Sequence, residues 1–126
     1  MLKVKVLCIM LALSLAALTG FSQEPKWLEM ENFHTVMSLS FHPAEENNLQ
    51  PIKEKSAELL SKAIAWQKSV APEGFNGEVT KPILKRLVKQ CRLVNAEIGN
   101  KTDAELKVML TKAHDIFHEI KEKCRK

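Results

Sequence analysis

The sequence lacks the motifs that identify most enzymes. It has only four glycines in 126 residues, with no phosphate-binding glycine loop, no G-x-S-x-G motif and no pair of E-x-x-H motifs of the di-iron type. Its last cysteine, Cys124, lies six residues beyond His118, so a helix would place the two side chains on different faces rather than as a nucleophile and its base. We therefore predict a protein that is not an enzyme.

The sequence also lacks a strand pattern, an internal repeat and a low-complexity tract. Its 19 Lys and Arg residues and 15 Asp and Glu residues are interspersed, and they leave a formal net charge of +4. Charges mixed in this way do not make the basic footprint of a nucleic-acid-binding protein. We expect no nucleic-acid partner.

The first 22 residues have the pattern of an export signal. Lys3 and Lys5 precede an apolar run over residues 6–18, and Gly20 and Ser22 supply the small residues that a signal peptidase requires. The apolar run is too short to span a bilayer comfortably, which favours cleavage after Ser22 over an uncleaved membrane anchor.

Removal of the signal, residues 1–22, leaves residues 23–126 as a single domain that we expect in the periplasm. A lipid anchor needs a cysteine directly after the cleavage site, whereas Cys8 lies inside the signal. We therefore expect no attachment to the membrane once the signal has been cleaved.

Four stretches of the mature region have apolar residues at three- and four-residue spacing, which is typical of amphipathic helices. These stretches cover residues 27–41, 51–70, 80–98 and 103–124. Their apolar stripes, in chain order, are Met30, Phe33, Met37 and Phe41; Ile52, Leu59, Ala63, Trp66 and Val70; Ile83, Leu87, Cys91, Val94 and Ile98; and Leu106, Met109, Leu110, Ala113, Phe117, Ile120 and Cys124.

Helix-breaking residues separate the four stretches. The first is expected to end at His42, because the residue before a proline, here Pro43, is disfavoured in the α region. A loop at residues 71–77 follows the second stretch, Gly99 ends the third, and a capping box beginning at Thr102 opens the fourth. Short links favour antiparallel neighbours, so we predict an all-α, up-down-up-down antiparallel four-helix bundle.

All four histidines of the chain lie at the first and last helical stretches, which are neighbours in such a bundle. At about 1.5 Å of rise per residue, His34 and His118 lie at similar heights, as do Met37 and His114. His114 and His118 also share a helical face, because they are four residues apart. Imidazole binds zinc, copper and iron, and a thioether adds affinity for Cu(I). The candidate metal ligands are therefore His34, His114 and His118, completed by Met37 or His42.

Ordinary packing offers an alternative interpretation of these residues. His114 and His118 flank the apolar stripe, where half-solvated histidines are common. Met37 lies on a stripe, and methionine fills gaps between helices well. His42 lies farther along its helix, and it would otherwise form a second cluster with the two acidic residues of the following link, Glu45 and Glu46.

Two cysteines, Cys91 and Cys124, remain in the mature region, and in an oxidising periplasm they could form a disulfide bond. A disulfide requires the two Cα atoms to lie within about 7 Å of each other. Cys91 and Cys124 are expected at heights along the bundle that differ by more than this distance, so we expect no disulfide between them. Cys91 is expected to be buried. Cys124 is expected either to be exposed, where it could link two molecules as a homodimer, or to join a metal site at the base of the bundle.

The segment HDIFH, residues 114–118, occupies the place at which cytochromes c′ carry C-x-x-C-H. Together with the export signal and four helices, this segment makes the chain similar to the cytochrome c′ and cytochrome b562 group of exported bundles. His114 and Phe117 stand where that motif has its two cysteines, so covalent haem c is excluded. The resemblance to the b562 type implies that Met30 and His118 could hold a haem b.

Three functions follow from these patterns. The first is an exported metal-binding bundle that takes copper or zinc, with iron next, and serves in metal storage, delivery or redox relay. The second is a haem-b electron carrier, and the third is a metal-free helical interaction module. The first two would need a redox or metal-transfer protein partner, whose identity the sequence leaves open.

Overall fold

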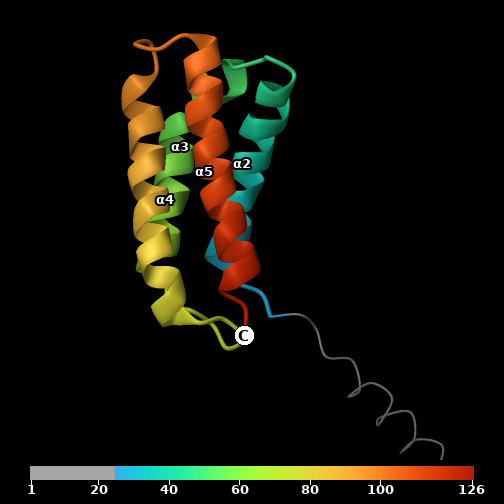
Figure 1. Cartoon of the computed structure of the whole chain (residues 1–126), viewed down its shortest axis with the longest axis vertical. Coiled ribbons are helices and arrows are strands. Elements are labelled where there is room, and N and C mark those ends of the chain that lie inside the picture. The colour runs from blue at the N-terminus through green and yellow to red at the C-terminus, as the bar shows by residue number, and fades with distance from the viewer. Residues whose placement is uncertain (1–24) are drawn as a thin grey trace, which may run out of the picture.

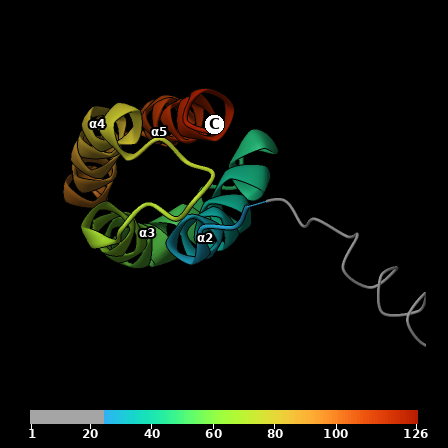
Figure 2. The same ribbon diagram turned by 90° about the horizontal axis from the view of Figure 1, so that it is seen from below.

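The computed structural model describes residues 25–126, so the predicted export signal lies outside the described residues. Within them, the chain forms α2 (Leu28–Glu45), α3 (Gln50–Lys68), α4 (Gly77–Glu97) and α5 (Asp103–Lys123). These helices run alternately up and down, and each lies beside the next (Figure 1). Seen from below, they form a ring in which α5 returns to the side of α2 (Figure 2). The predicted all-α antiparallel four-helix bundle is confirmed.

The end of α2 differs from the prediction, because the helix continues through Pro43. Pro43 has no backbone N–H, so the carbonyl of Leu39, four residues earlier, loses its helical hydrogen bond. Leu39 lies on the exposed side of the helix, where water can bind that carbonyl instead. The helix ends at Glu45 with Glu46 as its cap, and Asn47 then turns the chain with a left-handed φ of 62°. The amides of Asn47 and Asn48 each donate across 2.9 Å to the carbonyls of Ala44 and Pro43, which is the Schellman pattern of a helix end.

The start of α4 also differs from the prediction. The helix begins at Gly77 rather than near Thr80, because Asn76 caps it. The Asn76 side-chain oxygen accepts a hydrogen bond from the amide of Val79 at 3.3 Å, and this bond satisfies one of the free amides of the first turn.

The link between α4 and α5 agrees with the prediction. Gly99 ends α4 with a φ of 90°, a left-handed conformation that favours glycine. Thr102 and Glu105 form the predicted capping box: the Thr102 hydroxyl accepts from the Glu105 amide at 3.2 Å, and the Glu105 carboxylate accepts from the Thr102 amide at 2.9 Å.

The apolar stripes meet in the interior of the bundle. Val70 is the exception, because it lies beyond the end of α3 and is 90% exposed. Phe41, Ile98 and Met109 pack at the edge of the core. The buried members of the stripes are Met30, Phe33, Met37, Ile52, Leu59, Ala63, Trp66, Ile83, Leu87, Cys91, Val94, Leu106, Leu110, Ala113, Phe117, Ile120 and Cys124.

The two cysteines of the described residues, Cys91 and Cys124, are buried, and both are free, as the sequence predicts. Burial raises the pKa of the Cys91 thiol to about 12, so this thiol stays protonated and packs as a small apolar group. The burial of Cys124 corrects the expectation of an exposed thiol, because a fully covered sulfur cannot link two molecules.

The lower end of the bundle is closed by the end of the chain. The Asn76 amide donates to the Cys124 carbonyl at 2.7 Å, and the Lys126 amide donates to the Gly74 carbonyl at 2.8 Å. Gly74 has a φ of 96°, and a Cβ added there would lie 2.4 Å from Cγ of Pro25. Only glycine therefore allows Pro25, the loop before α4 and the residues after α5 to meet at this end.

Candidate metal site

The four histidines lie along the line where α2 and α5 meet. The contact between these two helices is the least extensive of the four contacts between neighbours in the ring. The backbones of α2 and α5 approach each other closely at few points. Stacked pairs of a phenyl ring and an imidazole ring, one from each helix, connect them instead. We call this line the histidine seam, and its residues are His34, Phe41, His42, His114, Phe117 and His118.

His114 and His118 form the centre of the seam. Their Nε2 atoms lie 3.1 Å apart and share a hydrogen bond, in which one ring's N–H donates to the other ring's nitrogen. The ring centroids are 4.5 Å apart, with an angle of 64° between the rings. Two imidazoles on one zinc or copper ion have metal–nitrogen distances of about 2.0–2.1 Å, which at tetrahedral angles separates their nitrogens by about 3.4 Å. The two rings therefore lie within a few tenths of an ångström of the spacing that a shared ion requires.

Two stacked rings, one from each helix, position the histidines across the seam. The ring of Phe41 stacks on His114 with the centroids 3.8 Å apart and the planes 12° apart. The ring of His34 stacks in the same way on Phe117, at 5.0 Å and 16°. Phe117 also touches His118 edge-on at 5.4 Å, so a single buried phenyl ring separates His34 from the central pair.

The surroundings of His114 favour its neutral imidazole form. Burial lowers the pKa of His114, and the positive charge of His118 lowers it further, while the carboxylates of Asp115 and Glu45 oppose both effects. Neutral imidazole is the form that binds metal ions, and this environment supplies it at neutral pH.

Burial also lowers the pKa of His34, assisted by Lys121, His118 and His42 and opposed by Glu31. His34 and His118 lie on either side of the Phe117 ring, as their similar predicted heights indicate. His34 is therefore poised as a neutral donor beside the central pair.

The second nitrogen of His114 also suits a metal ligand. Its Nδ1 is buried and forms no hydrogen bond with any described atom, and the nearest carboxylate oxygen, Oδ1 of Asp115, lies 3.6 Å away. A ligating histidine commonly donates this N–H to a carboxylate, which fixes the ring and its tautomer. A shift of a few tenths of an ångström would complete that hydrogen bond.

The remaining predicted ligands do not join the central pair. The side chain of His42 is 72% exposed, and its Nδ1 lies 3.0 Å from the Glu45 carboxylate, as in the second cluster that the sequence left open. Met37 and Met30 are buried as members of the core. Among residues 25–126, no group of three or more His, Cys, Asp or Glu side chains is arranged to hold a metal ion. The described arrangement therefore supplies a pair of donors and one flanking imidazole.

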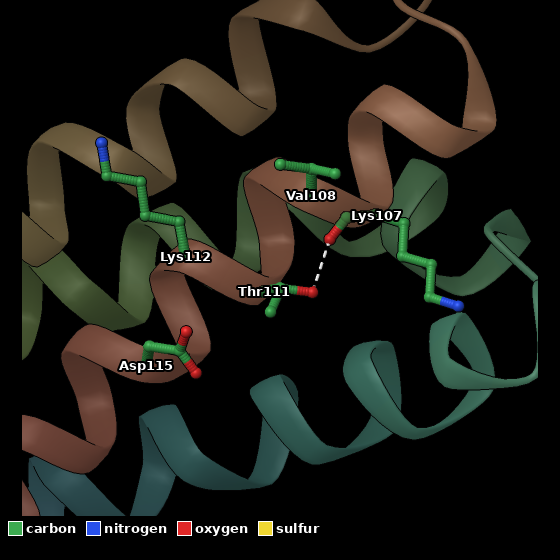
Figure 3. A pocket seen from close by; sticks show the side chains of 5 residues that line it. All are labelled: Lys107, Val108, Thr111, Lys112 and Asp115. Atoms are coloured by element: carbon green, nitrogen blue, oxygen red, sulfur yellow. Dashed lines mark hydrogen bonds between the residues drawn. The ribbon is translucent and has the colours of Figure 1, made fainter.

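The sequence interpretation missed two features of the seam. Phe41 was assigned only to the apolar stripe, yet it stacks on His114, and Asp115 was not singled out although it faces Nδ1 of the same ring. The position of Asp115 directly after His114 is a signal that could have found it. Figure 3 shows Asp115 with other residues that line a pocket along α5, namely Lys107, Val108, Thr111 and Lys112.

The interior does not offer an obvious place for a porphyrin beside Met30 and His118. The rings of Phe33, Trp66 and Phe117 contact one another with centroids 5.6–6.0 Å apart, and they fill the bundle at the level of Phe117. A haem ligated by His118 would have to separate these rings, so the described residues fit a bare ion better than they fit haem b.

Comparison with known proteins adds no relative to this picture. No family model matches the chain, and no curated protein or solved structure matches it either. The resemblance to the cytochrome c′ and b562 group therefore stays a prediction from the HDIFH segment and the four helices, and the function is argued from the seam itself.

Proposed function

We propose that this protein is an exported bundle that binds one copper or zinc ion at the histidine seam and delivers it to another protein. The observation that supports this proposal is the 3.1 Å separation of the His114 and His118 Nε2 atoms. An ion that replaces the shared proton needs only a small increase in this separation, to about 3.4 Å, and the lowered pKa of His114 keeps its ring in the ligating form.

The number of donors favours delivery over storage. Structural zinc sites surround the ion with four protein ligands, whereas the described seam offers two ligands and the nearby ring of His34. An ion held by so few protein groups keeps coordination positions open to water or to a partner's side chain. Such an ion can be passed on by ligand exchange.

The chain's own residues have separate roles in this proposal. His114 and His118 bind the ion through Nε2, and Asp115 accepts a hydrogen bond from Nδ1 of His114 and orients that ring. Phe41 covers His114 by stacking and limits the access of water on one side. His34 supplies a third nitrogen when its ring slides off Phe117. We leave His42 and Met37 out of the ligand set, because one pairs with Glu45 and the other packs in the core.

Titration of metal-free protein with zinc sulfate and with copper sulfate tests the proposal. We expect one ion per chain and a rise in the melting temperature, because an ion that binds only the folded state at 100 times its Kd stabilises it by about 2.7 kcal/mol. His114→Gln and His118→Gln should each weaken binding by more than about tenfold, and Asp115→Asn should weaken it by about tenfold.

His42→Gln is the matched control, since it removes an imidazole from the same helix pair and should leave the affinity unchanged. If His114→Gln and His118→Gln bind zinc and copper as tightly as the wild type does, the seam is not a metal site. A Soret band in protein isolated from the periplasm, with one iron per chain, would instead favour haem at Met30 and His118.

A further inference from the structure

One helix carries an unusual concentration of positive charge. Lys81, Lys85, Lys89 and Arg92 are all exposed on α4, and their spacing of four, four and three residues places them on one face of the helix. The face extends over about 16 Å. None of the four forms an ion pair with any residue between Pro25 and Lys126. We call these four residues the basic stripe.

The fold does not require the basic stripe. Like charges four residues apart on a helix repel each other, so the stripe opposes the helix that carries it. The ion pairs that the described residues do form, such as the 2.7 Å contact of Lys53 with Asp103, lie off the stripe. Because no described carboxylate offsets the repulsion among these four cations, we infer that acidic groups of another molecule offset it.

An apolar groove lies beside the stripe, between α4 and α5. Its hollow of about 320 Å³ is lined by Leu93 and Ile116, by the buried amide of Gln90, and by the cations Arg86, Lys89 and Lys112. Lys89 thus belongs to both the stripe and the groove.

The groove continues along α5. Val108 is 70% exposed and Leu93 is 43% exposed. A second, separate hollow is lined by Val108 and Met109 together with the charged side chains of Lys101 and Glu105. Figure 3 shows Val108 and Lys112 on neighbouring turns of α5. Of the acidic residues nearby, Glu119 is already held by Arg86 at 2.7 Å. The groove therefore combines an apolar floor with a rim of cations, of which Lys89 and Lys112 form no ion pair with a described carboxylate.

We propose that the α4–α5 groove binds an acidic amphipathic helix of a partner protein. Apolar side chains of that helix would cover Leu93, Val108 and the edge of Ile116, and its carboxylates would pair with the basic stripe, with Lys112 and with Lys89 at the rim. This combination matches the helix-in-groove mode of recognition, in which an apolar face gives the affinity and charge gives the orientation and partner choice. The proposal rests on α4 and the adjoining face of α5, and it does not depend on metal binding at the seam.

The chemistry of the groove disfavours other polyanions. No aromatic side chain lines the two hollows, so single-stranded nucleic acid would find no ring on which to stack its bases. Of the apolar side chains at the groove, only Val108 and Leu93 project, and Ile116 is buried, whereas a lipid bilayer binds a broad face of projecting apolar groups.

A titration followed by NMR tests the proposal with a defined probe. The probe is a synthetic helical peptide with leucine at three- and four-residue spacing and glutamate elsewhere, and its matched control has the same composition in scrambled order. Adding the probe to ¹⁵N-labelled protein should shift the amide signals of α4 and of α5 near Val108 and Lys112, and the affinity should fall as salt is raised from about 0.05 M to about 0.5 M. The scrambled peptide should shift these signals much less.

Charge reversal then locates the binding. The variant K81E/K85E/K89E/R92E should bind the probe at least about tenfold more weakly than the wild type. The variant K26E/K55E/K62E/K68E makes the same change in net charge elsewhere on the bundle and should bind as the wild type does. Circular dichroism confirms that both variants remain helical. Equal loss in the two variants would overturn the proposal, as would tighter binding of anionic phosphatidylglycerol vesicles or of single-stranded DNA than of the peptide.

Discussion

Helix α5 packs against its two neighbours in different ways. Its contact with α4 is extensive and apolar, with Leu110 and Leu87 fully buried. Its contact with α2 is much smaller and consists largely of stacked rings, such as Phe41 on His114. Where apolar side chains interlock completely, a polar side chain has no room for a water molecule or another group with which to form a hydrogen bond, so its burial is unfavourable. The looser contact is the one that can hold imidazoles with one edge in solvent, so the candidate chemistry lies where the bundle is least tightly packed.

A pair of truncations tests this comparison with the largest expected effect. Leu110→Ala should lower the free energy of unfolding by about 2–5 kcal/mol, because it leaves a cavity in a fully packed region. Phe41→Ala should cost less than about 2 kcal/mol, because Phe41 is half-buried and the seam can relax around the missing ring. Urea unfolding measures both values. Equal losses would mean that the seam is packed as tightly as the α4–α5 contact.

The pH dependence of stability sharpens the comparison at the seam. The folded state lowers the pKa of His34 and His114 below their ordinary value of 6.5, so between the folded and unfolded values the unfolded chain binds more protons. Stability should therefore be fully present above about pH 6.5 and should fall as the pH decreases toward the folded pKa values.

The measurement compares urea midpoints at about pH 7.5 and about pH 5.5 in the presence of a chelator. The lowered pKa values of Glu105 and Glu119 belong to carboxyl groups, whose ordinary value of 4.5 lies below this window. The double variant His34→Gln and His114→Gln should lose less stability than the wild type over the same interval. An identical loss in wild type and variant would place the sensitive groups outside the seam.

The smallest expected effect concerns a polar tie across the top of the seam. The Lys107 ammonium donates to the Glu45 carbonyl at 3.3 Å and to the Asn47 side-chain oxygen at 3.1 Å, which joins α5 to the end of α2. Lys107→Met should change the free energy of unfolding by less than about 1 kcal/mol, because exposed hydrogen bonds of this kind exchange readily with water. A larger loss, measured by thermal unfolding, would show that this tie contributes more than the stacked rings.

The fold was largely predictable from the sequence because apolar periodicity is a strong signal over long helices. The stripes identify the four helices, and Gly99 and Thr102 mark one link correctly. The error at Pro43 has a physical cause. Pro43 lies in the last turn, where the carbonyl that it leaves unpaired belongs to the exposed Leu39. The helix ends two residues later, and Asn47 turns the chain in a left-handed conformation. A single asparagine among several polar residues does not reveal such a turn.

The candidate site was predictable only in part. The spacing of His114 and His118 indicated the central pair, because both lie on one face of one helix. The height estimate placed His114 level with Met37, whereas the ring contacts Phe41 one turn farther along α2. Helical side chains lean toward the start of their own helix, so in antiparallel helices two of them meet between levels. Which ring covers which histidine therefore depends on packing across helices.

The closed lower end of the bundle has a mechanical consequence. Pro25 packs against Gly74, and Lys126 is hydrogen-bonded to the same glycine, so both described chain ends leave the bundle on one side. A force applied between these ends would load the Asn76–Cys124 and Gly74–Lys126 bonds first, in an opening motion rather than along the helix axes. The bundle would then open from its base, and the stacked rings of the histidine seam would separate from the His34 and His118 end.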